Sequence, residues 1–142
     1  MSPIKALVTG GVGFIGSHLV ERLLQDGHEV LVLDNFSTGK SENLQASSEN
    51  PKLSVHEVDI SNHEDVAPFL TRIDWVFHMA ALADIVPSIE QPLKYHHANV
   101  DGTVSVLEAA RNADVNRFVY AASSSCYGMP DQTPMLRFPT LK

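Results

Sequence analysis

A glycine-rich segment near the amino terminus restricts the fold of this chain more than any other feature. Residues 9–16 read Thr-Gly-Gly-Val-Gly-Phe-Ile-Gly. An apolar stretch typical of a buried strand, 4–9, precedes them, and residues 16–25, apolar at helical spacing, follow them. Glycines at such a turn allow a tight bend, a close approach of the backbone to a phosphate, and tight packing of the helix on the sheet. Since the free N–H groups at a helix start attract anions, the segment predicts a pyrophosphate site.

Asp34 strengthens this interpretation, because it directly follows the second predicted strand, 29–33. A carboxylate at this place accepts hydrogen bonds from the ribose hydroxyls of an adenine dinucleotide. The same charge repels a 2′-phosphate, and the nearest cation in the sequence, Lys40, is six residues away. The pattern therefore predicts NAD rather than NADP. The alternative is a purely structural glycine turn, which the agreement of turn, helix and acid disfavours.

Predicted strands and helices alternate along the chain, which is typical of a parallel sheet covered on both faces. The strands are expected at 4–9, 29–33, 53–58, 75–80 and 117–122, and the helices at 16–25, 61–70 and 92–112. The apolar stripe of the first helix is expected to comprise Ile15, Leu19, Val20, Leu23 and Leu24, and the apolar side of the last helix Val100, Val104, Leu107 and Ala110. Ser61 and Glu64 have the spacing of a capping box that opens the second helix. Right-handed crossovers then predict an α/β fold, a doubly wound parallel sheet in the order 3-2-1-4-5.

Composition excludes several other classes of protein. The 142 residues suffice for one domain, and the net charge of −7 argues against a nucleic-acid or anionic membrane surface. No apolar run approaches the ~18 residues of a membrane-spanning helix. The single cysteine, Cys126, cannot form an internal disulfide, which favours a cytoplasmic location.

Five further motifs accompany the glycine-rich segment. They are Leu-Asp-Asn-Phe-Ser-Thr-Gly at 33–39, Val-Asp-Ile at 58–60, His-Met-Ala-Ala at 78–81, Asn-Val-Asp-Gly-Thr at 99–103 and Ser-Ser-Ser-Cys-Tyr-Gly at 123–128. In this order and spacing the chain resembles the extended short-chain dehydrogenase/reductases, a Rossmann-fold group. Within that group it is most similar to the NAD-dependent nucleotide-sugar epimerases and dehydratases, especially the UDP-sugar 4-epimerases.

The resemblance implies a set of cofactor-binding residues. The pyrophosphate turn would comprise Gly10, Gly13, Phe14, Ile15 and Gly16, and the adenosine ribose would lie among Asp34, Asn35, Phe36, Ser37, Thr38 and Gly39. Asp59 and Ile60 would meet the adenine, with Asp59 accepting a hydrogen bond from its amino group. Met79, Ala80, Ala81 and Leu82 would run beside the nicotinamide half of NAD.

Asp59 and several other polar residues have structural interpretations as well as functional ones. Asp59 could instead cap the turn that follows it. His78 ends a predicted buried strand and is expected to be a hydrogen-bonded core histidine, and Asn99 is expected to tie helix backbone to a neighbouring strand. Adjacent residues on a helix point about 100° apart, so the pair His96 and His97 predicts no metal site.

The resemblance also implies a reaction at C4 of a nucleotide sugar, in which hydride passes to NAD and returns to the other face of a 4-keto sugar. Ser123 matches the hydroxyl that donates to the C4 oxygen, and Ser124 and Ser125 would touch the hexose. Serines at these two positions argue against dehydration, because the dehydratase relatives carry an acidic pair there. The general base of the family is the tyrosine of a Tyr-x-x-x-Lys pair, and no such pair occurs in the chain.

We therefore expect a truncated NAD-binding Rossmann domain at residues 1–128, an irregular segment at 129–142, and the C-terminal part of the family fold to be missing. This chain alone should bind NAD without turnover. The expected partners are a UDP-hexose in the full-length family and a second copy of the chain, which docks through the 92–112 helix. The alternatives are a non-catalytic NAD-sensing or protein-binding module and a related nucleotide-sugar reductase or decarboxylase.

Overall fold

Five parallel strands form the central sheet of the computed structural model, which describes residues 2–123. The strands are β1 (Lys5–Thr9), β2 (Glu29–Asp34), β3 (Leu53–Glu57), β4 (Trp75–His78) and β5 (Arg117–Tyr120). Their order across the sheet is β3-β2-β1-β4-β5. This confirms the predicted topology, with strand ends that differ from the predicted ones by at most two residues.

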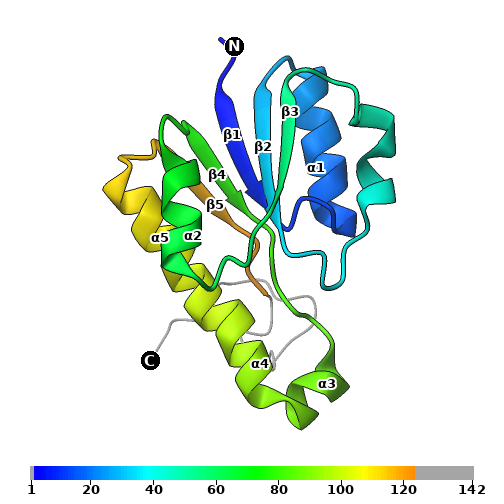
Figure 1. Cartoon of the computed structure of the whole chain (residues 1–142), viewed down its shortest axis with the longest axis vertical. Helices are drawn as coiled ribbons and strands as arrows, with labels where there is room; N and C mark the ends of the chain where they lie inside the picture. Colours follow the sequence, from blue (N-terminus) through cyan, green and yellow to red (C-terminus); the bar gives the residue numbers. More distant parts are fainter. Residues whose placement is uncertain (1, 124–142) are drawn as a thin grey trace, which may run out of the picture.

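Helices cover both faces of the sheet (Figure 1). One face carries α1 (Phe14–Gln25) and the 3₁₀ helix η1 (Ser41–Ser47). The other carries α2 (His63–Val66), the 3₁₀ helix η2 (Ala67–Leu70), and a continuous helix made of α4 (Pro92–His96), the π-helical η3 (His97–Asp101) and α5 (Gly102–Asn112). A further short helix, α3 (Ile85–Glu90), was not predicted from the sequence.

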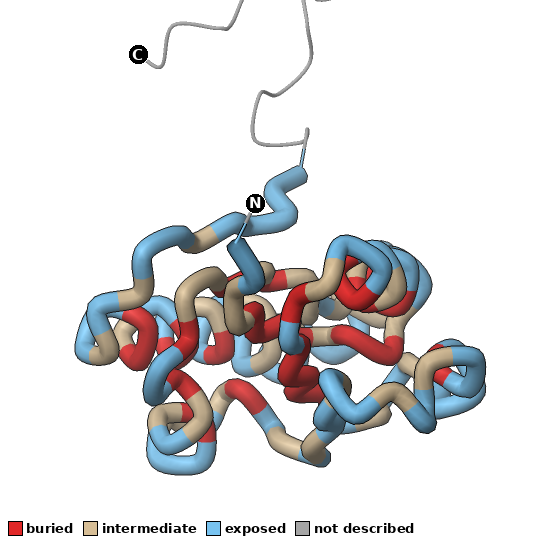
Figure 2. Tube along the Cα trace, turned by 90° about the horizontal axis from the view of Figure 1, so that it is seen from above, coloured by how far each residue is buried: buried red, intermediate tan, exposed pale blue. Residues whose placement is uncertain are grey.

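The core lies in two layers, one on each side of the sheet. Successive residues of β1 point to opposite faces, so Leu7 joins the cluster under α5 and Val8 joins the cluster under α1. Figure 2 shows the buried residues concentrated along the strands and on the inner sides of the helices. The near-continuous apolar sequence of β1 and β2 reflects burial on both faces.

Strand register decides where the functional segments meet. Thr9 at the end of β1 pairs with Leu33 of β2 on one side and with His78 of β4 on the other. The segments that follow these three strands therefore leave the sheet at one edge. The glycine-rich turn, Asp34 and the segment that begins at Met79 come together there, at the carboxyl edge where open α/β sheets bind ligands.

Two details of the predicted helices are wrong. Helix α1 begins at Phe14 rather than at residue 16, and Ile15, which the helical spacing places in its apolar stripe, is 67% exposed. The capping box at Ser61 does not form, because α2 begins two residues later. Its N-cap is Asn62, whose side-chain oxygen accepts a hydrogen bond from the backbone N–H of Glu64 at 3.3 Å.

The helix predicted at 92–112 is present, but the apolar side assigned to it is only partly right. Of the four expected residues, Ala110 is buried, whereas Val100, Val104 and Leu107 are 46%, 60% and 44% exposed. The face that meets the sheet instead includes Val106. The helix therefore carries a second apolar stripe that the described residues leave uncovered. Within residues 2–123, no helix has both the length and the apolar character needed to cross a membrane.

Candidate functional site: a cleft at the carboxyl edge of the sheet

The glycine-rich turn is fixed by its own backbone. Gly10 has a φ of +68° and donates its N–H to the carbonyl of Leu33 at 2.9 Å. It lies so close to the segment after β4 that a Cβ would be 2.7 Å from the backbone of Ala80. A Cβ at Gly16 would overlap the carbonyl oxygen of Gly10. The glycines thus let the turn fold against both the sheet and the first helical turn.

Helix α1 starts without a side-chain cap. Its N-cap residue is Gly13, and its first turn contains no acidic residue. The N–H groups at this end have no side-chain acceptor, and the positive end of the helix dipole is not neutralised locally. Since Gly10 and Gly13 line the cleft, this end of the helix can stabilise an anion there.

Asp34 holds two turns together. Its carboxylate accepts a hydrogen bond from the backbone N–H of Val12 at 3.1 Å through one oxygen, and from the N–H of Phe36 at 2.9 Å through the other. The residue is only 8% exposed, yet it lines the cleft. Because a carboxylate offers about four acceptor positions, Asp34 keeps capacity for hydroxyl donors from a ligand.

Asp59 forms the turn cap that was the structural alternative for it. One carboxylate oxygen accepts both the N–H and the hydroxyl of Ser61, at 3.0 and 2.7 Å, and the other lies 3.4 Å from the side-chain nitrogen of Asn35. These donors, the Ser61 hydroxyl foremost, lower the pKa of Asp59 below its usual value. The carboxylate is therefore charged at neutral pH, and its second oxygen is the less occupied one.

His78 is a core histidine, as predicted. It is 1% exposed, with Nδ1 at 2.8 Å from the Thr9 hydroxyl and Nε2 at 2.9 Å from the Thr103 hydroxyl. Thr103 donates its hydroxyl proton to the carbonyl of Asn99, so it accepts from Nε2, and Thr9 accepts from the N–H of Ala80 and donates to Nδ1. A neutral ring that carries its proton on Nε2 satisfies all of these hydrogen bonds. Burial lowers the pKa of His78 to about 4, in agreement with that neutral state.

Asn99 also has a structural role, although its partner differs in detail from the expected one. Its side-chain oxygen accepts the N–H of Leu82 at 2.8 Å and its nitrogen donates to the carbonyl of Leu82 at 2.9 Å. The predicted tie therefore joins the helix to the segment after β4 rather than to a strand. This pair of hydrogen bonds fixes the long helix against one wall of the cleft.

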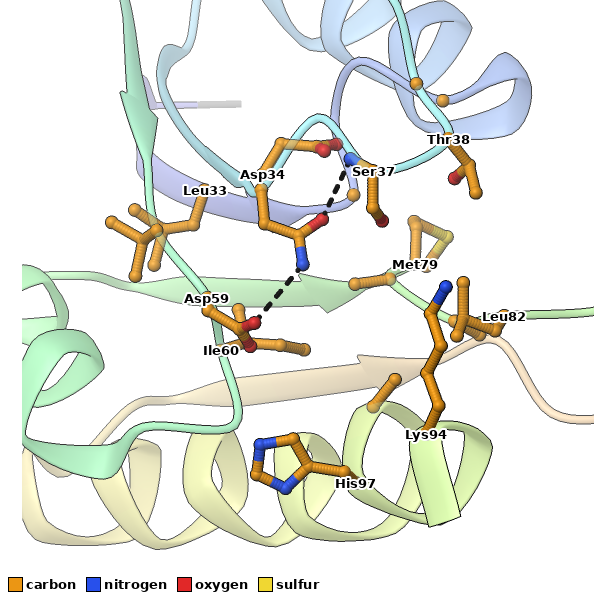
Figure 3. Close-up of a pocket in the computed structure, with 18 residues that line it drawn as sticks. Leu33, Asp34, Ser37, Thr38, Asp59, Ile60, Met79, Leu82, Lys94 and His97 are labelled. Atoms are coloured by element: carbon orange, nitrogen blue, oxygen red, sulfur yellow. Dashed lines mark hydrogen bonds between the residues drawn. The ribbon is translucent and has the colours of Figure 1, made fainter. Parts of the chain in front are cut away.

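One cleft of about 180 Å³ collects most of the predicted cofactor-binding residues. Figure 3 shows its walls, with Asp34, Ser37 and Thr38 on one side, Asp59 and Ile60 on a second, and Met79 and Leu82 on a third. The predicted residues that line it are Gly10, Gly13, Asp34, Asn35, Ser37, Thr38, Gly39, Asp59, Ile60, Met79, Ala80, Ala81 and Leu82. Four others, Phe14, Ile15, Gly16 and Phe36, are adjacent in the chain but are not part of this lining.

The long helix supplies a wall that the sequence analysis missed. Lys94, His97 and Ala98 line the cleft, and Lys94 and His97 reach into it from below the strands in Figure 3. Their i, i+3 and i+4 spacing is the signal that could have identified one helix face. His97 also connects to the Asp59 side of the cleft, because its Nε2 is 2.9 Å from the Ser61 hydroxyl, which donates to Asp59. Its Nδ1 is 2.9 Å from Asp101.

The predicted catalytic hydroxyl lies just past the sheet. Ser123 follows β5, is exposed and takes part in an interaction, but it is not among the described residues that line the cleft. Ser124, Ser125 and the irregular segment predicted at 129–142 lie outside the described residues. Among residues 2–123, no group of three His, Cys, Asp or Glu side chains could hold a metal ion.

Comparisons with known proteins agree with this geometry. A family model described as NAD dependent epimerase/dehydratase family matches residues 6–141. The UDP-glucose 4-epimerase of Lactobacillus helveticus is 38% identical over 134 residues, which are 93% of this chain and 39% of that protein. UDP-glucuronic acid decarboxylase 1 of Arabidopsis thaliana is also 38% identical, over 131 residues that cover 92% of this chain and 29% of that protein.

A solved structure shares the fold closely. The UDP-glucose 4-epimerase of Stenotrophomonas maltophila, crystallised with NAD and a formylated UDP-arabinopyranose, superposes with a TM-score of 0.84 at 31% identity. The match covers 92% of this chain and 40% of that one, so the chain spans about two-fifths of the solved relative. With a family model that matches nearly every residue and a cleft built from the motifs of that family, the chain belongs to the NAD dependent epimerase/dehydratase family.

Proposed function

We propose that this chain binds NAD and forms the cofactor-binding part of a nucleotide-sugar 4-epimerase. In such an enzyme hydride is removed from C4 of the sugar and returned to it through a 4-keto intermediate. The proposed NAD-binding domain comprises residues 1–128. NAD, when bound, supplies the hydride acceptor, whereas the residues of this chain bind and orient the dinucleotide.

The position of Asp34 in the cleft is the observation that carries the proposal. Its carboxylate touches the glycine-rich turn through the N–H of Val12 and faces the same cleft as the uncapped start of α1. A ligand that carries ribose hydroxyls close to a phosphate fits this arrangement, because the carboxylate can accept from the hydroxyls and the start of α1 can bind the phosphate. The negative charge of Asp34 disfavours a ligand with a 2′-phosphate, which supports NAD over NADP.

Asp59 supports an adenine at the far end of the cleft. Its first carboxylate oxygen accepts two hydrogen bonds from Ser61, whereas its second has only the long contact to Asn35. That second oxygen has capacity for an amino group of the adenine. Turn capping and adenine recognition therefore use different atoms of one side chain, and the two roles are compatible.

A UDP-hexose is the proposed substrate of the full-length enzyme, because proteins named UDP-sugar epimerases are similar over more than nine-tenths of this chain. Within this chain we propose Ser123 as the hydroxyl that donates to the sugar C4 oxygen, and Ser124 and Ser125 as hexose contacts. No Tyr-x-x-x-Lys pair occurs among the 142 residues. Lacking that base, the chain should bind NAD without turnover.

Two other functions have specific support. The absence of a Tyr-x-x-x-Lys pair favours a non-catalytic NAD-sensing or protein-binding module. The equal 38% identity to a UDP-glucuronic acid decarboxylase favours a related activity on the same scaffold. Turnover assays with the full-length enzyme on UDP-glucose and UDP-glucuronic acid would separate the epimerase from the decarboxylase.

Isothermal titration of the purified chain with NAD and NADP tests the proposal. We expect saturable binding of NAD, weaker binding of NADP, and no interconversion of UDP-glucose and UDP-galactose when NAD is present. A chain that binds neither dinucleotide would refute cofactor binding. Interconversion at an ordinary enzymatic rate would refute the expected lack of turnover.

A further inference from the structure

Lys94 is a charged residue of the cleft to which the family motifs assign no role. It lies in α4, outside all six motifs, and its side chain extends from the helix toward Met79 and Leu82 in Figure 3. Among the described residues that line the cleft it is the only lysine or arginine. The acidic residues of the same lining are Asp34 and Asp59, so the cleft holds one lysine between acidic walls.

The charged side chains of the cleft differ in whether they have partners within the protein. Asp34 accepts two backbone N–H groups, and Asp59 accepts donors from Ser61 and Asn35. The side chain of Lys94, in contrast, forms no hydrogen bond or ion pair with any residue in the range 2–123. Of the other lysines in this range, Lys5 pairs with Glu29 at 2.9 Å and Lys52 donates to a carbonyl at 2.8 Å, whereas the side chain of Lys40, which is not part of the cleft lining, also forms no such contact. The structure therefore gives Lys94 no role in holding the fold.

The helix that carries Lys94 is held at a fixed position relative to the cleft. Five residues further on, Asn99 makes its two hydrogen bonds to the backbone of Leu82, which itself lines the cleft. Gly102 packs the same helix against Ile60, where a Cβ would be 3.1 Å from that side chain. These two attachments keep Lys94 on the wall that faces the glycine-rich turn and limit how far its ammonium group can lie from a ligand.

We propose that the ammonium group of Lys94 binds the pyrophosphate of the dinucleotide from the side opposite the glycine-rich turn. The inference rests on the proposed binding of NAD and assigns a residue to it. The adenosine end has its own residues, Asp34 and Asp59, which are anionic and would repel phosphates. A bound pyrophosphate adds two further negative charges, and Lys94 together with the start of α1 balances them from two sides.

Titrations with ligands that differ in phosphate content test this role. The full chain and its Lys94→Met variant are titrated with NAD, ADP and adenosine, and Lys52→Met, on the far side of the domain from the cleft, is the matched control. We expect NAD and ADP to bind Lys94→Met about tenfold more weakly, adenosine to bind both chains equally, and Lys52→Met to match the wild type. The salt dependence of NAD binding should also be shallower in Lys94→Met.

Lys94→Arg separates charge from shape, because it keeps the cation and should retain most of the NAD affinity. Equal affinity of wild type and Lys94→Met for NAD would overturn the inference while leaving NAD binding intact. An equal loss of NAD and adenosine would overturn it as well, because it would indicate a change in the fold of the cleft. A wild-type chain that binds no NAD would refute the proposed function itself.

Discussion

Thr9 and His78 are 69 residues apart in the sequence, and their side chains are joined by a buried hydrogen bond of 2.8 Å. The bond crosses from the end of β1 to the end of β4, next to the point where Gly10 leaves the sheet. Through its other ring nitrogen His78 reaches Thr103 on the long helix. One neutral histidine thus connects the glycine-rich turn, the sheet and the helix that forms a wall of the cleft.

The burial of His78 makes the free energy of unfolding depend on pH. Burial lowers the pKa of His78 from 6.5 to about 4, so between these values the unfolded chain binds more protons than the folded chain. Stability contributed by the neutral ring is fully present above pH 6.5 and is lost as the pH falls toward 4. The loss should reach at most about 3 kcal/mol.

Urea unfolding at several pH values between 7 and 4 measures this effect. His78→Gln should be less stable at pH 7 and should lose most of the pH dependence in this range. The control His96→Gln, on an exposed helix face, should keep the wild-type dependence. If His78→Gln kept the pH dependence of the wild type, another group would have to cause that dependence.

Gly10 should tolerate no side chain. Gly10→Ala combines a φ of +68° with a Cβ 2.7 Å from the backbone of Ala80, and we expect it to lower the free energy of unfolding by more than about 3 kcal/mol. Gly27 is the matched control, because its φ is +87° but a Cβ there would meet no atom within 4 Å. Gly27→Ala should cost about 1–2 kcal/mol, which is the backbone strain alone. Thermal or urea unfolding would distinguish the two, and equal losses would contradict the steric argument.

Asp34→Asn should weaken NAD binding and reduce the preference for NAD over NADP. The amide keeps one oxygen for the N–H of Phe36 or Val12 but removes the charge that repels a 2′-phosphate. We expect NAD to bind about tenfold more weakly, with a smaller loss or a gain for NADP. Calorimetric titration measures the affinities for NAD and NADP, and Asp26→Asn at the exposed end of α1 serves as the control. An unchanged ratio of the two affinities would argue against the proposed contact with the ribose.

The exposed stripe of Val100, Val104 and Leu107 should drive self-association of this chain, in line with the proposed homodimer through the 92–112 helix. Val104→Lys should shift sedimentation toward the monomer. Ile15→Lys introduces the same charge at a residue that is 67% exposed on another face, and it should sediment like the wild type. A wild-type chain that stays monomeric at high concentration would argue against the helix as a dimer surface.

Local sequence patterns predicted the elements and their order, because burial on both sheet faces leaves continuous apolar strands between amphipathic helices. They were less reliable where several weak signals compete. Ile15 fits the helical stripe but lies beyond the core, and Ser61 has the spacing of a cap but donates to Asp59 instead, which leaves Asn62 to start α2. Helix α3 has too few residues to show a clear period.

The sequence by itself determined the glycine-rich turn, the acid at the end of β2 and the family to which they belong, since each is a run of neighbouring residues with a fixed local geometry. Only the tertiary structure decided that Lys94 and His97 face the same cleft, and that Asn99 holds their helix to Leu82. These contacts join residues far apart in the chain. They depend on strand register and on the position of the helix against the sheet, which no local pattern of residues encodes.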